Sequence, residues 1–340
     1  MPSDNISKNA DESERIGLME SQSSSSMKPI EVGSSSSSAS SSTAGAGPSR
    51  FKILVGIAMY SLCSASLLLI NKFAVEALPS VSFVLTAQFV SSVLVVKVCG
   101  ALGYLEVDAL EWSKVKGFFG VAFLFSCCLF TNVKALQYCN VETVIVARAC
   151  SPIAVAIADF YFLGQMLPNA RSWCSLIIIV AGAVAYVSFE DGMKIESISW
   201  VIAYFASIVS EMVYVKYVID KIDMTTWGRV YYNNLLSIPP VLLFGAIFND
   251  HVALMEHHWD RGTAFFLTLS CIVGVGISYA GFNLRALITA TSFTVVGVVN
   301  KLATTAVNAL VWDKHANGLG IAALVVTIFG GTMYQQSKKR

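Results

Sequence analysis

The chain alternates long apolar stretches with short polar segments. A helix that crosses the hydrocarbon core of a bilayer needs about 20 consecutive, mostly apolar residues. Ten stretches near that length lie between residues 53 and 336. The pattern therefore predicts an all-α membrane protein with ten transmembrane helices. The predicted spans are roughly 53–75, 80–103, 116–137, 141–163, 172–189, 197–219, 230–249, 263–286, 290–312 and 318–336.

Composition supports this class over a soluble one. Of the 340 residues, 55% are apolar and 13% are charged, whereas soluble domains usually carry about 25% charged residues. The formal net charge of +1 does not point to a charged partner, and we expect lipid rather than nucleic acid around the chain. None of the eight cysteines has metal-ligand spacing, so we expect no metal.

The first fifty residues differ from the rest because they are rich in serine and lack an apolar run. Such a composition predicts a disordered tail, and acidic residues within it argue against an organellar transit peptide. We expect residues 1–50 to form a cytosolic tail, residues 51–336 to form the membrane domain, and residues 337–340 to form a basic cytosolic end.

Basic residues fall mainly in alternate loops, which sets the predicted orientation. Loops that stay in the cytosol carry an excess of lysine and arginine. With ten helices, both termini lie on the basic side, so we expect both to be cytosolic. The basic residues on that side are Arg50, Lys52, Lys97, Lys114, Lys116, Arg171, Lys216, Lys221, Arg229, Lys338, Lys339 and Arg340.

A weak internal repeat appears at an offset of about 149 residues. It places Ser151-Pro152 opposite Asn300-Lys301, and Gly182 opposite Gly331. With five helices in each half, the two halves would enter the membrane from opposite sides. Many secondary transporters are built as such inverted repeats, with the binding site between the halves. The sequence thus predicts two inverted five-helix repeats, with chance similarity as the alternative.

Two polar pairs stand inside predicted spans. Asn233 and Asn234 follow two tyrosines in the seventh span, and Asn300 precedes Lys301 in the ninth. A strongly polar or charged side chain at membrane depth costs about 2.5–3.5 kcal/mol on insertion scales, so it usually serves a site or a pathway. The alternative for the amides is interhelical hydrogen bonding, worth about 0.6 kcal/mol per bond.

Lys301 needs an anion because a buried ammonium is costly without one. No acid lies on its own predicted helix, so Asp159 or Glu211 on other helices could pair with it. The functional alternative is a phosphate clamp, which suits the compact charge of lysine.

Other polar residues at membrane depth are weaker candidates for a site. Lys72 could line a pathway or snorkel to the surface, and Arg285 could do the same. Arg148 could pair with Asp159 as a structural partner. The hydroxyls of Tyr60 and Ser278 could contact a ligand or satisfy backbone carbonyls. No Walker loop, nucleophile elbow or zinc-protease motif is present, so we expect neither an enzyme nor a cofactor.

The two polar motifs carry a family resemblance. YYNN at 231–234 and GVVNK at 297–301 resemble the FYNN and GALNK motifs of Golgi GDP-mannose transporters. Those proteins belong to the nucleotide-sugar branch of the drug/metabolite transporter superfamily. The stretches 278–301, 312–316 and 334–337 look closer to plant Golgi GDP-sugar transporters, which include carriers of GDP-fucose and GDP-L-galactose.

The resemblance implies a Golgi antiporter that imports cytosolic GDP-sugar in exchange for luminal GMP. By the same resemblance, the asparagine pair would read guanine, and the second pair would face the sugar and the diphosphate. Phe293 and Gly281 stand where GDP-mannose carriers have tyrosine and serine, which favours another GDP-sugar. The expected substrate-binding residues are Asn233, Asn234, Asn300, Lys301, Gly297, Tyr60, Ser278, Tyr232 and Lys72.

Two other interpretations stay open from the sequence. One is a plastid-type sugar-phosphate or phosphate translocator, which the acidic tail disfavours. The other is a membrane scaffold that transports nothing. The sequence also leaves open the identity of the sugar and whether the chain forms a homodimer.

Overall fold

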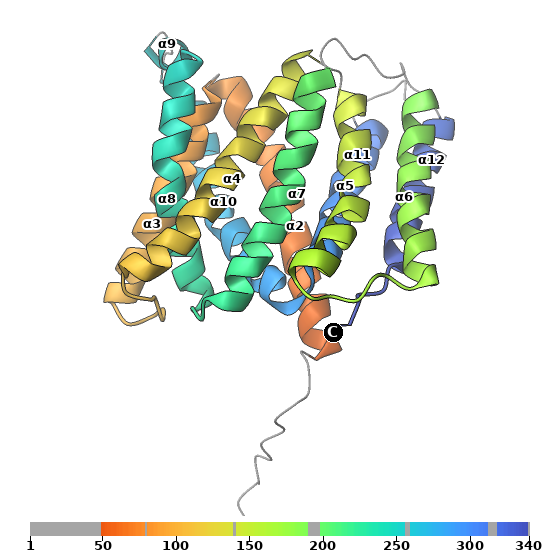
Figure 1. Cartoon of the computed structure of the whole chain (residues 1–340). Coiled ribbons are helices and arrows are strands. Elements are labelled where there is room, and N and C mark those ends of the chain that lie inside the picture. The colour runs from red at the N-terminus through yellow and green to blue at the C-terminus, as the bar shows by residue number, and fades with distance from the viewer. Residues whose placement is uncertain are drawn as a thin grey trace, which may run out of the picture. The chain divides into compact units, whose positions relative to one another are not determined.

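The computed structural model describes residues 49–78, 80–138, 141–189, 198–255, 259–311 and 318–338. The described part consists of helices and their connections (Figure 1). The predicted tail lies almost wholly outside it. The long helices are α2 (Arg50–Ala77), α3 (Val81–Ala101), α4 (Trp112–Tyr138), α5 (Val141–Phe162), α6 (Ala170–Phe189), α7 (Ile198–Lys221), α8 (Thr226–Ile247), α10 (Arg261–Leu287), α11 (Ala290–Val311) and α12 (Gly318–Met333).

A long helix stands at the position of every predicted span. Eight of these helices are long and apolar enough to cross a membrane, and α12 is apolar but shorter. Helix α11, which carries Asn300 and Lys301, is not among the eight. The chain is thus a helical protein with several candidate spans, while ten crossings remain a prediction. The sequence did not predict α9 (Asp250–Met255), a six-residue helix between α8 and α10.

The start of α8 fixes the register of the asparagine pair. Thr225 caps this helix, because its hydroxyl accepts a hydrogen bond from the Gly228 N–H at 3.0 Å. Asp108, from the connection between α3 and α4, accepts bonds from the Thr225 N–H at 2.9 Å and from its hydroxyl at 2.8 Å. Gly228 allows this approach, since a Cβ there would collide with the Asp108 carboxylate.

The hydrogen bonds at this cap also set the charge state of the Asp108 carboxyl. Burial alone would raise its pKa, but the bonds from Thr225 and the nearby Lys114 ammonium outweigh burial. The pKa of Asp108 therefore lies below its ordinary value. The carboxylate is the charged acceptor that this cap requires.

Helix packing recurs between the two halves of the chain when α2 to α6 are matched in order with α7, α8, α10, α11 and α12. Helix α2 packs along α10 as α7 packs along α4, and α3 packs on α10 as α8 packs on α4. Helix α6 lies beside α5 as α12 lies beside α11. Three matched pairs also contact each other directly, namely α3 with α8, α5 with α11, and α6 with α12.

Candidate functional site

A cavity of about 170 Å³, with polar and charged groups in part of its wall, lies between helices from both halves of the chain. Helices α2, α4, α7, α8, α10 and α11 each contribute to its wall. Three of the predicted site residues line it together, namely Tyr60, Asn233 and Ser278. The complete lining is Tyr60, Phe125, Glu211, Asn233, Ile277, Ser278, Gly281, Phe282, Arg285 and Phe293.

The two asparagines of α8 have different surroundings, because adjacent residues point about 100° apart on a helix. Asn233 lines the cavity. The side-chain amide of Asn234 instead donates to the Val230 carbonyl one turn earlier, at 2.8 Å. Its Oδ1 is buried without a hydrogen-bond partner among the described residues. Only Asn233 therefore presents an amide to the cavity in this conformation.

The side chain of Tyr232 makes structural contacts within the protein rather than lining the cavity. Its hydroxyl donates to the Ala109 carbonyl at 2.5 Å and accepts from the Glu111 N–H at 2.7 Å. Its ring is fully buried against Phe118, with 5.7 Å between ring centroids. These contacts tie α8 to the loop before α4, and Tyr232 is not part of the cavity wall.

Asn300 faces a different opening from the central cavity. Its Oδ1 accepts a hydrogen bond from the Ser61 hydroxyl of α2 at 2.9 Å, and its Nδ2 is buried without a partner among the described residues. Asn300 lines a cleft of about 520 Å³ formed by α2, α11 and α12, together with the turn after α10. An unsatisfied amide donor beside a cleft is a candidate ligand contact.

Lys301 lies on the side of α11 that is within electrostatic reach of Arg148 on α5. Gly297, one turn earlier, keeps space beside that guanidinium, since a Cβ there would lie 4.0 Å from Arg148 Nη2. Lys72 falls within α2, but its side chain lies outside the described part of the structure.

Arg148 has a partner that the sequence did not identify. Its Nη1 donates to the hydroxyl of Tyr204 on α7 at 3.2 Å. This partner is a neutral group and not a carboxylate. Asp159, the acid considered as its partner, instead caps α11. That carboxylate accepts from the Thr291 N–H at 3.0 Å and from the Thr291 hydroxyl at 2.7 Å. Arg148 also lies within electrostatic reach of Tyr60 in the cavity wall.

Glu211 pairs with Arg285 rather than with Lys301. The distance from Glu211 Oε1 to Arg285 Nη2 is 2.9 Å. The same guanidinium lies over the ring of Phe293, with its Cζ 4.5 Å from the ring centroid. Lys216 donates to the Arg285 carbonyl at 3.0 Å. Arg285 therefore belongs to the cavity wall and does not snorkel to the surface.

Basic side chains lie in and near the cavity wall. Arg285 lines the cavity and pairs with Glu211, whereas Arg148 is within electrostatic reach of Tyr60, and Lys301 is within reach of Arg148. Side chains of this kind suit an anionic ligand. The sequence had flagged both arginines as polar residues at membrane depth, but it gave neither a role in the site. Their partners depend on helix rotation, which the sequence does not fix.

Several characterised proteins are similar to the chain over most of its length. It is 41% identical over 290 residues to GDP-fucose transporter 1 of Arabidopsis thaliana, covering 82% of this chain and 84% of that protein. It is 39% identical to GDP-mannose transporter GONST3 of the same plant, covering 83% and 78%. GDP-mannose transporter 1 of Saccharomyces cerevisiae strain YJM789 is 23% identical, with coverage of 84% and 91%.

A solved structure also matches the fold. The crystal structure of another protein superposes with a TM-score of 0.65, covering 84% of this chain and 96% of that one. At 15% identity, that likeness shows a shared fold alone. No protein-family model matches the chain.

Proposed function

Since the chain belongs to the GDP-sugar transporters, a group of nucleotide-sugar transporters, we propose that it exchanges cytosolic GDP-sugar for luminal GMP across the Golgi membrane. It is a transporter and not an enzyme. The observation that carries the proposal is the joint placement of Tyr60, Asn233 and Ser278 around one cavity. Arg148 is within electrostatic reach of Tyr60, and Lys301 is within reach of Arg148.

Guanine recognition is assigned to the α8 side of the cavity. An amide side chain offers a donor and an acceptor, so Asn233 can match part of the guanine edge. Ser278 adds a hydroxyl on the same wall. A site built from such groups rejects a base that leaves them unpaired, because the unpaired groups remain buried. Asn234 would join the base site only after its bond to Val230 is broken.

Phosphate recognition is assigned to the cations on the opposite helices. Lys301 acts as a point charge, and Arg148 can bind phosphate oxygens through two parallel N–H donors. The diphosphate of a GDP-sugar carries about two negative charges, as does GMP near neutral pH. Either ligand can therefore bind to the same cations, and exchange requires such a shared site.

The transport cycle we propose is a rocking motion of two inverted five-helix halves around the cavity. The matched packing of α2–α6 and α7–α12 supports it, because transporters built from related halves alternate by rocking one half against the other around a fixed site. The cavity wall draws on helices from both halves, so their relative movement would open it to either side. Both termini would then face the cytosol.

The choice of sugar is assigned to the region around Phe293. Its ring lies 4.9 Å from that of Tyr60 and under the Arg285 guanidinium. Gly281, beside Tyr60, adds no hydroxyl to this wall. Both positions are apolar here, so we propose GDP-fucose or GDP-L-galactose as the preferred substrate over GDP-mannose.

Counter-exchange in proteoliposomes tests the proposed activity. Purified full-length protein would be reconstituted into vesicles preloaded with GMP, UMP or AMP, and uptake of labelled GDP-fucose, GDP-L-galactose and GDP-mannose measured. We expect stimulation by internal GMP alone and the slowest uptake for GDP-mannose. Equal stimulation by the three nucleotides would count against guanine recognition, and no uptake of any GDP-sugar would overturn the proposal.

Variants separate the two ends of the proposed site. Asn233→Leu should weaken competition by GMP by up to about tenfold, because the lost hydrogen bonds are neutral. Lys301→Gln should weaken the binding of every phosphorylated ligand by about ten- to a hundredfold, because the lost contact is charge-assisted. Lys52→Gln, an exposed basic residue at the start of α2, is the matched control and should transport normally. Epitope tags at each terminus, probed in sealed Golgi vesicles, test the location and the orientation.

A further inference from the structure

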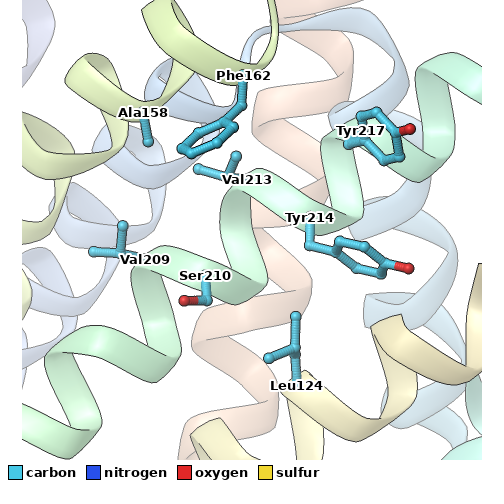
Figure 2. Close-up of a pocket in the computed structure, with 8 residues that line it drawn as sticks. All are labelled: Leu124, Ala158, Phe162, Val209, Ser210, Val213, Tyr214 and Tyr217. Atoms are coloured by element: carbon cyan, nitrogen blue, oxygen red, sulfur yellow. The ribbon is translucent and has the colours of Figure 1, made fainter.

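An apolar groove of about 400 Å³ lies on the outer side of α7, away from the central cavity. Helix α4 borders it on one side and α5 on the other. Figure 2 shows Phe162 of α5 directed toward Val213 of α7, with Leu124 of α4 at the opposite end. All the lining side chains except Ser210 are apolar or aromatic. The lining is Leu124, Ala158, Phe162, Val209, Ser210, Val213, Tyr214 and Tyr217.

The groove opens toward the medium around the helices. Phe162 is 73% exposed and Tyr217 is 41% exposed. Helices α4, α5 and α7 are all candidate membrane spans, so this medium is bilayer hydrocarbon along most of the groove. The volume is within the range of about 300–1,000 Å³ of small-molecule pockets. An aliphatic chain fits both the shape and the surroundings.

One end of the groove is polar and basic. Lys221 follows Tyr217 by one turn of α7, and its ammonium lies 5.5 Å from the centroid of that ring. Lys116 of α4 is at the same end, because the neighbouring Gly117 packs against Ile222, just past α7. The hydroxyls of Tyr214 and Tyr217 point to one side of the groove (Figure 2). Aromatic hydroxyls and lysines at a helix end are typical of the headgroup level.

We propose that the groove binds one acyl chain of an anionic glycerophospholipid, with the headgroup phosphate near Lys116 and Lys221. The apolar length of the groove matches the acyl chain, and the two lysines match the headgroup charge. A basic residue near an anionic leaflet contributes about 1 kcal/mol of attraction. A helix from a second copy would leave these two cations without a counter-charge, so a lipid is the better occupant.

The bound lipid would brace the wall of the central cavity. Helix α7 presents Ser210 to the groove and the adjacent Glu211 to the cavity. The ring of Tyr214 rests on Gly120 of α4, where an added Cβ would lie 2.7 Å from it. An acyl chain beside Tyr214 and Val213 would therefore hold α7 between α4 and α5. This inference goes beyond transport, because lipid binding is measured without a transported substrate.

Thermal unfolding of the purified full-length protein in detergent tests the proposal. The probes are dioleoylphosphatidylserine and dioleoylphosphatidylcholine, added at equal concentrations. We expect both lipids to raise the unfolding midpoint, and the anionic lipid to raise it by several degrees more. Val213→Trp, which fills the groove, should lose most of the rise from both lipids. Lys116→Gln with Lys221→Gln should lose only the excess produced by the anionic lipid.

Two controls separate the groove from general lipid effects. Ile202→Trp adds the same ring to α7 at a position that is 59% exposed and outside the groove. Lys52→Gln removes a basic charge elsewhere, and both controls should respond like the wild type. Equal effects of the two lipids on the wild type would overturn the proposal, as would a full rise in Val213→Trp. Conversion of a dimer to a monomer by Val213→Trp in light scattering would instead assign the groove to a second copy.

Discussion

Two polar clusters lie at different levels of α10 and join helices from the two halves of the chain in different ways. The charged cluster (Asp159, Glu211, Lys216 and Arg285) surrounds the turn between α10 and α11. The amide cluster (Asn71, Gln88 and Ser270) joins α10 to α2 and α3. Ser270 and Arg285 are fifteen residues apart on α10, or about 22 Å along its axis.

The amide cluster is a small, neutral and closed network. Gln88 Nε2 donates to Asn71 Oδ1 at 2.9 Å and to Ser270 Oγ at 2.5 Å. The Ser270 hydroxyl donates to Asn71 Oδ1 at 2.6 Å. Each residue contacts both of the others, and none of them lines the central cavity. A ligand in the cavity therefore cannot compete directly for these hydrogen bonds, and we expect them to persist through transport.

The charged cluster differs because two of its members line the cavity. Glu211 and Arg285 pair across the cavity wall, and a phosphate group could take the place of the carboxylate. Asp159 holds the start of α11 through Thr291, and its Oδ1 is buried without a partner among the described residues. We therefore expect a fixed connection at one level of α10 and a ligand-sensitive connection at the other.

The largest effect should come from removing one charge of the buried pair. Glu211→Ala leaves the Arg285 guanidinium without its carboxylate, and the Glu211 side chain is only 3% exposed. Breaking a buried pair in this way costs about 3–5 kcal/mol. The free energy of unfolding, measured by denaturing-detergent titration in mixed micelles, should fall by that amount.

The same variant tests whether the charged cluster responds to ligand. A phosphate group can supply the missing counter-charge, so GMP should stabilise Glu211→Ala more than it stabilises the wild type. Glu211→Gln keeps the size of the side chain and is the matched control, with an intermediate loss. A loss below about 1 kcal/mol, the scale of an exposed ion pair, would contradict the buried pairing.

A smaller effect should follow from Asp159→Ala. The change removes the acceptor for the Thr291 N–H and hydroxyl at the start of α11. The loss of such a helix cap costs about 1–2 kcal/mol. Asp159→Asn keeps one oxygen as an acceptor and should lose less. If the two variants unfold alike in the same titration, the carboxylate charge, rather than its hydrogen bonds, stabilises this turn.

Asp108 lies outside both clusters and provides a reference for how much a hydrogen-bonded carboxylate in a loop contributes to the free energy of unfolding. Asp108 has a lowered pKa because the hydrogen bonds from Thr225 outweigh its burial. Its contribution to stability should be complete above the unfolded value of about pH 4 and should be lost as the pH falls through the folded pKa. Asp108→Asn should cost about 1 kcal/mol near neutral pH.

The pH dependence provides the control for that variant. The difference in unfolding midpoint between the wild type and Asp108→Asn should be constant from neutral pH to about pH 5 and should shrink below pH 4. A difference that grows on acidification would reverse the sign and exclude a lowered pKa at Asp108.

The helices could be predicted from the sequence because apolar length is a strong signal. The span expected at 141–163 is α5 (Val141–Phe162), and the one expected at 290–312 is α11 (Ala290–Val311). Helix α9 was missed because six residues at the end of an apolar stretch carry no periodic signal of their own. The number of membrane crossings stays a prediction, since α11 carries polar residues and α12 is short.

The site could be predicted only in part. Hydropathy picks out Asn233, Lys301, Arg148 and Arg285 because each is costly in lipid. It does not show which neighbour each one meets, since that depends on the rotation of every helix about its axis. The pairing of Glu211 with Arg285 is therefore visible only in three dimensions. Tyr232 shows the converse, because its motif suggested a ligand contact and its hydroxyl binds a loop.

The smallest effect should come from the amide cluster. Gln88→Leu keeps the approximate volume of the side chain and removes its hydrogen bonds to Asn71 and Ser270, while the bond between those two residues remains. Hydrogen bonds between membrane helices average about 0.6 kcal/mol, so the loss should be of that order. It should also be the same with and without GMP, because the cluster has no contact with the cavity. If GMP changes the loss, the amide cluster rearranges with the charged one, and the distinction between a fixed and a ligand-sensitive level of α10 fails.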